Sequence, residues 1–202
     1  QLADEFEAQP ITARTCDELP WLLKETDSLA HLRACLLHID RFLLIYTRDK
    51  EELRRYWVEQ LQEQQTMGKA YLGSFEPWSR EPGRQEPNIA YAASRLGLFL
   101  LDAALHAEAE PLMRRALAVD EQSFGPEHPD VAIRLNNLAA LLQATNRLAE
   151  AEPLMQRALA IDEQSFGPEH PDVAIRLNNL AQLLQATNRL AEAEPLMRRA
   201  LA

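Results

Sequence analysis

Two segments in the C-terminal part of the chain are almost identical, and this repetition constrains the fold more than any other feature. Residues 128–160 and 170–202 differ at only two of 33 aligned positions, and they are offset by 42 residues without a gap. Residues 86–127 align on 128–169 in the same way, although their first half has diverged. Repetition every 20–50 residues is typical of a stacked solenoid rather than of one closed core. The sequence therefore predicts three units, 86–127, 128–169 and a shorter unit at 170–202.

Each unit has the hydrophobic pattern of two helices joined by a short turn. In the second unit, apolar residues recur at spacings of three and four along each predicted helix. They are Leu135, Leu138, Ala139 and Leu142 on the first, and Ala151, Met155, Ala158 and Leu159 on the second. Pro129 suits a first helical turn and Asp130 can cap it, whereas Gly167 permits a left-handed cap at the end of the second helix. Because proline is harmless only within a first turn, Pro153 predicts that the second helix either begins near Glu150 or is kinked.

Small residues at 139, 151 and 158 lie where two helices would pack closely, which is the tetratricopeptide pattern. The segments LNNLA (135–139), AEAEPL (149–154) and GPEHP (167–171), with the 42-residue length, resemble the kinesin-light-chain type of tetratricopeptide repeat. The resemblance implies an all-α fold, a right-handed superhelix of antiparallel helix pairs in which the longer unit extends the second helix and its loop.

Residues 1–85 do not repeat, but their pattern is also helical. The expected elements are 17–24, 29–39 with 42–46, 50–65 and 66–79, followed by a proline-containing connector at 76–87. The runs RTCDELPWLL (14–23), LLIYTRDKEELRRYW (43–57) and GKAYL (68–72) resemble the helical segment that precedes such repeats in nephrocystin-type and bacterial signalling ATPases. These belong to the STAND class, with an ATPase module of NACHT or NB-ARC type. We therefore expect a helical adaptor at 1–85, following an ATPase module outside this sequence, and repeats at 86–202.

Composition and charge exclude several classes of partner. The formal net charge of −10 opposes binding to phosphate backbones, so we expect no nucleic-acid partner. No apolar run approaches the roughly 18 residues of a membrane span, and no signal peptide is recognisable, so we expect no membrane contact and a cytoplasmic location. Cys16 and Cys35 fit two packed, reduced thiols. All ten basic residues of 86–202 are arginines, for which the sequence offers no reason.

The residues that could carry catalysis lack the required spacing. Gly68-Lys69 does not complete the phosphate-binding pattern G-x-x-x-x-G-K-[S/T]. Glu63 stands where the first glycine is required, and Ala70 stands where serine or threonine is required. His31 and His38 are seven residues apart, a poor spacing for joint metal ligation. His128 and His170 are one repeat position seen twice, and we expect them to cap a helix or pack against a turn. We therefore predict a non-enzymatic chain with no catalytic residue, metal site or cofactor.

A polar face beside the apolar face of the first helix in each unit is the predicted binding groove. It comprises Ile133, Asn136, Asn137, Ala140 and Gln143, and the copies Ile175, Asn178, Asn179, Gln182 and Gln185; Tyr91 stands at the equivalent of Ile133 in the first unit. Amide side chains donate and accept, which suits an extended peptide backbone, and the family resemblance implies that concave asparagines clamp a peptide. Alternatively, Asn136 and Asn137 satisfy neighbouring helix ends in the stack. Position 140/182 is one of the two that differ between the near-identical units.

Two functional hypotheses follow from these observations. The first is a ligand-sensing, protein–protein interaction module of a multidomain signalling or defence ATPase, binding a protein or peptide in the concave groove. The alternative is a structural spacer or scaffold without a dedicated ligand, which self-associates through the open repeat end at Ala202 because that end would expose an apolar face.

Overall fold

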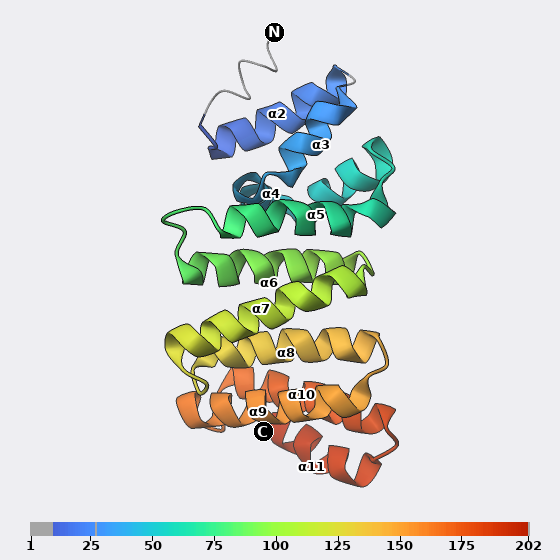
Figure 1. Cartoon of the computed structure of the whole chain (residues 1–202). Helices are drawn as coiled ribbons and strands as arrows, with labels where there is room; N and C mark the ends of the chain where they lie inside the picture. The colour runs from blue at the N-terminus through green and yellow to red at the C-terminus, as the bar shows by residue number, and fades with distance from the viewer. Residues whose placement is uncertain (1–9, 27, 202) are drawn as a thin grey trace. The chain divides into compact units, whose positions relative to one another are not determined.

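The computed structural model describes residues 10–26 and 28–201, and in these ranges every regular element is helical. The predicted all-α class is therefore confirmed. The elements, drawn in Figure 1, are α2 (Ala13–Glu25), α3 (Leu29–Leu37), α4 (Ile39–Arg55), the π-helical η1 (Tyr56–Gln60), α5 (Gln64–Ser79), α6 (Glu86–Asp102), α7 (His106–Phe124), α8 (Pro129–Ala144), α9 (Leu148–Phe166), α10 (Pro171–Ala186) and α11 (Leu190–Ala200). No helix of the described ranges is both long and apolar enough to cross a membrane.

The chain divides into two compact units. The first, or N-terminal unit, runs to Asn88 and includes Arg95–Ala109; the second, or repeat unit, comprises Ile89–Ser94 and Glu110 onward. Helices α6 and α7 thus each contribute residues to both. The domain and repeat boundaries inferred from the sequence remain predictions.

Aromatic side chains form the core of the N-terminal unit. Phe42, Trp57 and Tyr71 are fully buried there. The Trp57 indole donates to the Tyr71 hydroxyl (3.1 Å), which donates in turn to the Leu36 carbonyl (3.2 Å), so the buried polar atoms of both rings are satisfied. Burial raises the pKa of Tyr71 far above its ordinary range.

The helix expected at 50–65 is wrong in its bounds. Asp49 has an extended conformation (φ −155°, ψ 96°), and its carboxylate accepts the backbone N–H groups of Glu51 and Glu52, which starts a new helical segment inside α4. That segment continues into the π-turn η1 and stops before Gln62, whose φ is +53°. A backbone in the left-handed region cannot extend a right-handed helix.

The connector between α5 and α6 is shorter than the prolines predict. Pro77 lies inside α5, and α6 already begins at Glu86. The turn is held by the Arg84 guanidinium, which donates to both carboxylate oxygens of Asp40 and lies 4.0 Å from the Trp78 ring centroid.

The helices of the repeat unit follow one another in antiparallel pairs (Figure 1). At the turn after α8, Asn146 takes φ +59°, and the Asn146 and Arg147 N–H groups bond to the carbonyls of Gln143 and Leu142. This is the Schellman arrangement, so the turn predicted at 145–147 is present with a defined cap. Helix α9 ends at Phe166, where Gly167 has φ +86°.

Two local expectations in the repeats need correction. Helix α9 begins at Leu148, earlier than Glu150, and it continues through Pro153 to Phe166. Proline there removes one backbone donor beyond the first turn. The cap of α8 is His128, in the capping role expected of this histidine, rather than Asp130. The His128 Nδ1 accepts the Asp130 N–H at 3.2 Å, and His170 repeats this on α10.

Candidate protein-binding face

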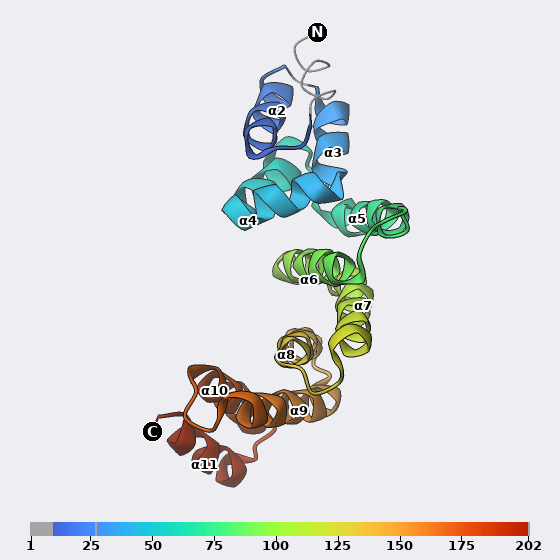
Figure 2. The ribbon, with the colours of Figure 1, turned by 90° about the vertical axis from the view of Figure 1, so that its left-hand side faces the viewer.

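The ten predicted groove residues lie along α8 and α10, and none of them is fully buried. Ile133, Ile175, Asn178, Gln182 and Gln185 are exposed, and Asn136, Asn137, Ala140, Gln143 and Asn179 are half-buried. The opposite faces of the two helices carry the buried leucines of the core. Figure 2 shows α8 and α10 toward the same side of the repeat unit. We call this surface the α8–α10 face.

Two of the predicted asparagines are used within the stack. The Asn179 Nδ2 donates to the Asn136 Oδ1 at 2.9 Å, linking α10 to α8 across one repeat. The asparagines were expected, as the alternative to peptide binding, to bond to helix ends. This bond instead joins the sides of α8 and α10, so the pair is used within the stack but not at a helix end. A side-chain amide already bonded in this way is less available to a peptide.

An exposed apolar row runs along the same face at one position of each repeat. Tyr91, Ile133 and Ile175 are 42 residues apart and are 37%, 43% and 50% exposed. The Arg134 Nη1 donates to the Ser94 Oγ at 2.8 Å, which brings α6 and α8 together one turn from Tyr91. The Asn136–Asn179 bond likewise lies one turn from the isoleucines. The three side chains occupy the same position of successive repeats and are named here the Tyr91–Ile133–Ile175 row.

Arginines join each repeat to the one before it. The Arg134 Nε donates to the buried Asp120 carboxylate (2.7 Å), and Arg176 makes the same bond to Asp162 (2.8 Å). Further pairs recur with the same period: Glu110–Arg147 and Glu152–Arg189, and Glu121–Arg157 and Glu163–Arg199. Each guanidinium reaches back across 14 to 37 residues, so these cations hold the stack together and are not free for a ligand.

Burial and hydrogen bonding shift the pKa values of the carboxyl groups in these pairs in opposite directions. Burial raises the pKa of Asp162 despite its bond to Arg176. Hydrogen bonds from Arg114, and then from Arg147, hold the pKa of Glu110 below its usual value. At Asp162, therefore, the effect of burial on the pKa outweighs that of Arg176.

The N-terminal turns of α8 and α10 give the α8–α10 face an acidic edge. Asp130 and Asp172 lie one helical turn before Ile133 and Ile175, and their side chains are 48% and 51% exposed. The arginines of these two helices are paired with Asp120 and Asp162, so Asp130 and Asp172 carry their exposed charge. Asp130 and Asp172 lie 3.6 Å and 3.7 Å from the Nδ1 atoms of His128 and His170.

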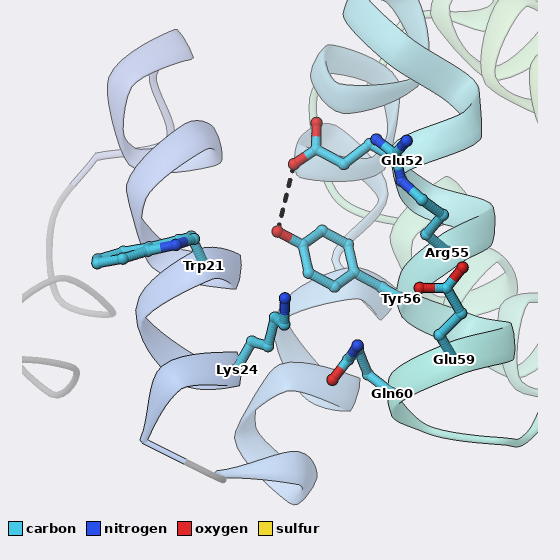
Figure 3. A pocket seen from close by; sticks show the side chains of 7 residues that line it. All are labelled: Trp21, Lys24, Glu52, Arg55, Tyr56, Glu59 and Gln60. Atoms are coloured by element: carbon cyan, nitrogen blue, oxygen red, sulfur yellow. Dashed lines mark hydrogen bonds between the residues drawn. The ribbon is translucent and has the colours of Figure 1, made fainter.

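A cavity in the N-terminal unit has no counterpart among the sequence predictions. It has a volume of about 210 Å³ and lies between α2, α4 and η1 (Figure 3). Its lining residues are Trp21, Lys24, Glu52, Arg55, Tyr56, Glu59 and Gln60. Trp21 is 57% exposed, and burial with the nearby Glu52 carboxylate raises the pKa of Tyr56 to about 12. Nothing in the sequence signalled this cavity. Trp21 lies in a run that was expected to be helical, and it has no equivalent in the repeats with which it could be compared.

The histidines, cysteines and acidic residues that the structure describes form no group of three or more that could hold a metal ion. Cys16 and Cys35 are buried thiols that are not joined in a disulfide, as expected from their sequence context, and the Arg41 Nη1 donates to the Cys35 Sγ at 3.2 Å. Burial raises the pKa of Cys16, which disfavours its thiolate.

Comparison with known proteins extends the resemblance over the whole chain. Residues 3–202 match the family model of the nephrocystin-3 TPR domain. Nephrocystin-3 of Mus musculus is 30% identical over 127 residues, which is 62% of this chain and 10% of that protein; nephrocystin-3 of Homo sapiens is 32% identical over 121 residues, 58% of this chain and 9% of that protein. The chain thus spans about a tenth of the length of these relatives.

Solved structures support the same architecture. The crystal structure of the nearly identical TPR-like repeats assigned to a kinesin light chain of Podosopora anserina superposes with a TM-score of 0.59 at 24% identity, covering 76% of this chain and 72% of that one. BtubC (BKLC) from P. vanneervenii gives 0.60 at 21% identity, covering 93% and 77%. At these identities the structures establish the tetratricopeptide-type solenoid fold alone.

Proposed function

Because the chain belongs to the nephrocystin-3 tetratricopeptide domain family, we propose that it is a protein-interaction module that binds an extended protein segment on the α8–α10 face. Tetratricopeptide repeats generally bind protein partners and are typically non-catalytic, so we assign the chain a binding role and no reaction.

The exposed apolar row carries this proposal. Ile133 and Ile175 remain 43% and 50% exposed, although neighbouring positions on both helices are buried. The exposed part of each isoleucine is not used in packing the stack, and exposed apolar surface that recurs along one face marks interaction sites. The half-buried Gln143 and the exposed Gln182 lie on the same face and offer donors and acceptors to a backbone.

Selection of displayed random peptides on the immobilised full chain tests the assignment. We expect the enriched peptides to bind the wild type and to lose at least tenfold in affinity against Ile133→Ser/Ile175→Ser. Leu44→Ser is the matched control, because Leu44 is 42% exposed but lies on α4. If the enriched peptides bind the double variant as tightly as the wild type, the α8–α10 face is not the binding site. Asn136→Ala is a poorer probe, since it also breaks the bond to Asn179.

We place the module in a longer, cytoplasmic signalling protein of the STAND ATPase class. The support is the similarity to nephrocystin-3 and the adaptor-like runs at 14–23, 43–57 and 68–72. In this proposal the repeats sense a ligand and the ATPase module responds. Reconstitution with the flanking sequence of the parent gene tests it: ATP hydrolysis that is unaffected by a selected peptide would contradict the sensing role.

Self-association through the repeat end at α11 is the alternative function that the sequence predicted, and it stays a proposal. Light scattering over a concentration series should show association that Met197→Gln weakens; a mass that stays monomeric at every concentration would exclude it.

A further inference from the structure

We propose that the cavity between α2, α4 and η1 binds a small zwitterion, an α-amino acid with a large apolar or aromatic side chain. This site is independent of the α8–α10 face, because every residue that lines the cavity belongs to the N-terminal unit. Its support comes from the polar groups around the cavity, from the π-turn that forms one wall, and from the buried residues that hold the walls in place.

The cavity occupies a helix seam that is polar where packed helices are usually apolar. Five of its seven lining residues recur at spacings of three and four along α4 and η1, and therefore share one helix face. They are Glu52, Arg55, Tyr56, Glu59 and Gln60. Figure 3 shows Lys24 of α2 pointing toward Tyr56 from the opposite wall. A helix face against a neighbour normally carries apolar side chains that fill the space between them, whereas here about 210 Å³ stays open.

Two opposite charges on the facing walls have no partner within the described part of the chain. Lys24 lies on α2 and Glu59 on η1, and no hydrogen bond or ion pair joins either side chain to a described residue. The other two charged lining residues, Glu52 and Arg55, already form ion pairs within α4. The lining therefore offers one cation and one anion to a ligand. An α-amino acid satisfies both, whereas an ion of a single sign satisfies one and faces a like charge.

Two aromatic side chains give the cavity its apolar surface. Tyr56 is 7% exposed, and its hydroxyl donates to Glu52 at 3.3 Å, which fixes the ring in the wall. Trp21 lies at the rim on α2 and is largely exposed. Ligand sites combine such apolar surface with a few placed polar groups. The volume is below the roughly 300–1,000 Å³ of sites for drug-sized molecules, so the cavity suits a ligand as small as one amino acid.

The wall opposite α2 is built on a rare backbone element. In the π-turn η1, the Leu61 N–H bonds to the Tyr56 carbonyl at 2.9 Å, five residues back. This turn carries Tyr56, Glu59 and Gln60, three of the seven lining residues. π-Turns are uncommon and occur frequently at functional sites. The turn is therefore an observation independent of the charges that also indicates a ligand site.

Buried leucines anchor both walls of the cavity. Leu19 and Leu23 of α2, on the helix that carries Trp21 and Lys24, have no exposed surface. Leu53 anchors α4 in the same way. The lining side chains thus project from elements whose other faces are fixed in the core, so the site is formed before a ligand enters.

Nuclear magnetic resonance titration of the full chain with L-phenylalanine tests the site. The chain has three tryptophans, and only Trp21 lines the cavity. We expect saturable shifts of the Trp21 indole N–H signal, which Trp21→Phe identifies by its loss. The signals of Trp57 and Trp78 should stay in place, because their indoles are bonded to other side chains of the N-terminal unit.

Two analogues and two variants test the recognition of each charge. L-Phenylalanine amide lacks the carboxylate, N-acetyl-L-phenylalanine lacks the ammonium group, and we expect each to bind at least tenfold more weakly than L-phenylalanine. Lys24→Met should abolish the preference over the amide, and Glu59→Gln the preference over the N-acetyl compound. Lys69→Met is the matched control and should keep both preferences, because Lys69 is exposed on α5 and does not line the cavity.

Each result decides one part of the proposal. The absence of a saturable shift of the Trp21 signal in the wild type would overturn the site. Equal binding of L-phenylalanine and its two analogues would overturn the recognition of a zwitterion. Preferences that survive both Lys24→Met and Glu59→Gln would show that other groups bind the charges. Lys24 and Glu59 are exposed, so these variants are expected to keep the fold, which circular dichroism checks.

Discussion

Replacing Arg176 with methionine is expected to lower the free energy of unfolding by about 3–5 kcal/mol at neutral pH, because it leaves a buried carboxylate without its partner. The Asp162 side chain is 2% exposed and that of Arg176 is 11% exposed, with 2.8 Å between Nε and Oδ2. Asp162 therefore has almost no access to water once the guanidinium is gone. The double variant Asp162→Leu/Arg176→Met removes both charges, and we expect it to lie within about 1 kcal/mol of the wild type.

The pH dependence of this loss has a defined sign. Burial already raises the pKa of Asp162 in the folded chain, and the loss of Arg176 raises it further. A carboxyl group whose pKa is higher in the folded state binds its proton more tightly there than in the unfolded chain. Folding is therefore favoured as the pH falls toward about 3.9, the ordinary pKa of an aspartate in the unfolded chain. The penalty of Arg176→Met should therefore shrink as the pH is lowered from about 7 to about 5.

Urea unfolding followed by circular dichroism measures these differences. Arg198→Met is the matched control, because the Arg198–Glu194 pair is 79% and 64% exposed, and we expect it to cost no more than about 0.5 kcal/mol. The reasoning is refuted if Arg176→Met costs no more than Arg198→Met, if the double variant is as unstable as the single one, or if the penalty grows as the pH falls.

Three further predictions use the same unfolding measurement. Ala104→Asn should raise the free energy of unfolding by about 1 kcal/mol, because alanine at φ +60° occupies the left-handed position that asparagine fills in the later repeats; a loss would contradict this. Gly73→Ala in α5 should stabilise the fold by about 0.5–1 kcal/mol, since an added Cβ would have no atom within 4 Å apart from its chain neighbours and the backbone of its own helix. Gly68→Ala in the same helix should destabilise, because the added Cβ would lie 2.9 Å from a Glu108 side-chain atom. Two variants with equal effects would mean that this contact gives way. Glu110→Gln should flatten the loss of stability at acid pH, because the lowered pKa of Glu110 stabilises the fold above about pH 4.3 and this contribution disappears as the pH falls through the folded pKa; an unchanged acid slope would contradict it.

The observed ends of the helices show which boundaries local sequence preferences can predict and which they cannot. The turn at 145–147 and the end of α9 at Gly167 follow from residues with special backbone preferences, so the sequence located both. The start of α9 was placed two residues too late, because Pro153 is accommodated beyond the first turn. The cap of α8 at His128 is one of the two roles that the sequence predicted for this histidine, although Asp130 was also expected to cap. Histidine is not among the residues usually expected there, although its Nδ1 is a competent acceptor.

The candidate face was predictable in position but not in composition. Helical spacing placed Ile133, Gln182 and their companions on one exposed side of α8 and α10. The asparagines used in stacking are defined by a hydrogen bond between residues 43 positions apart in the sequence. Helical periodicity describes neighbours within one helix and cannot predict such a bond. The cavity beside Trp21 likewise arises from elements brought together only by folding.

By itself, the sequence determined the repeat period, the helix pairs and the absence of lysine from 86–202, because these depend on local pattern and on direct comparison of one unit with the next. Only the tertiary structure decided why those cations are arginines. Six of the ten bond to carboxylates of the preceding repeat, two of these carboxylates being nearly buried. A planar guanidinium with several fixed donors can bridge such partners and remain charged when partly desolvated, as a flexible ammonium cannot. The stack of repeats therefore depends on ion pairs whose partners lie far apart along the chain.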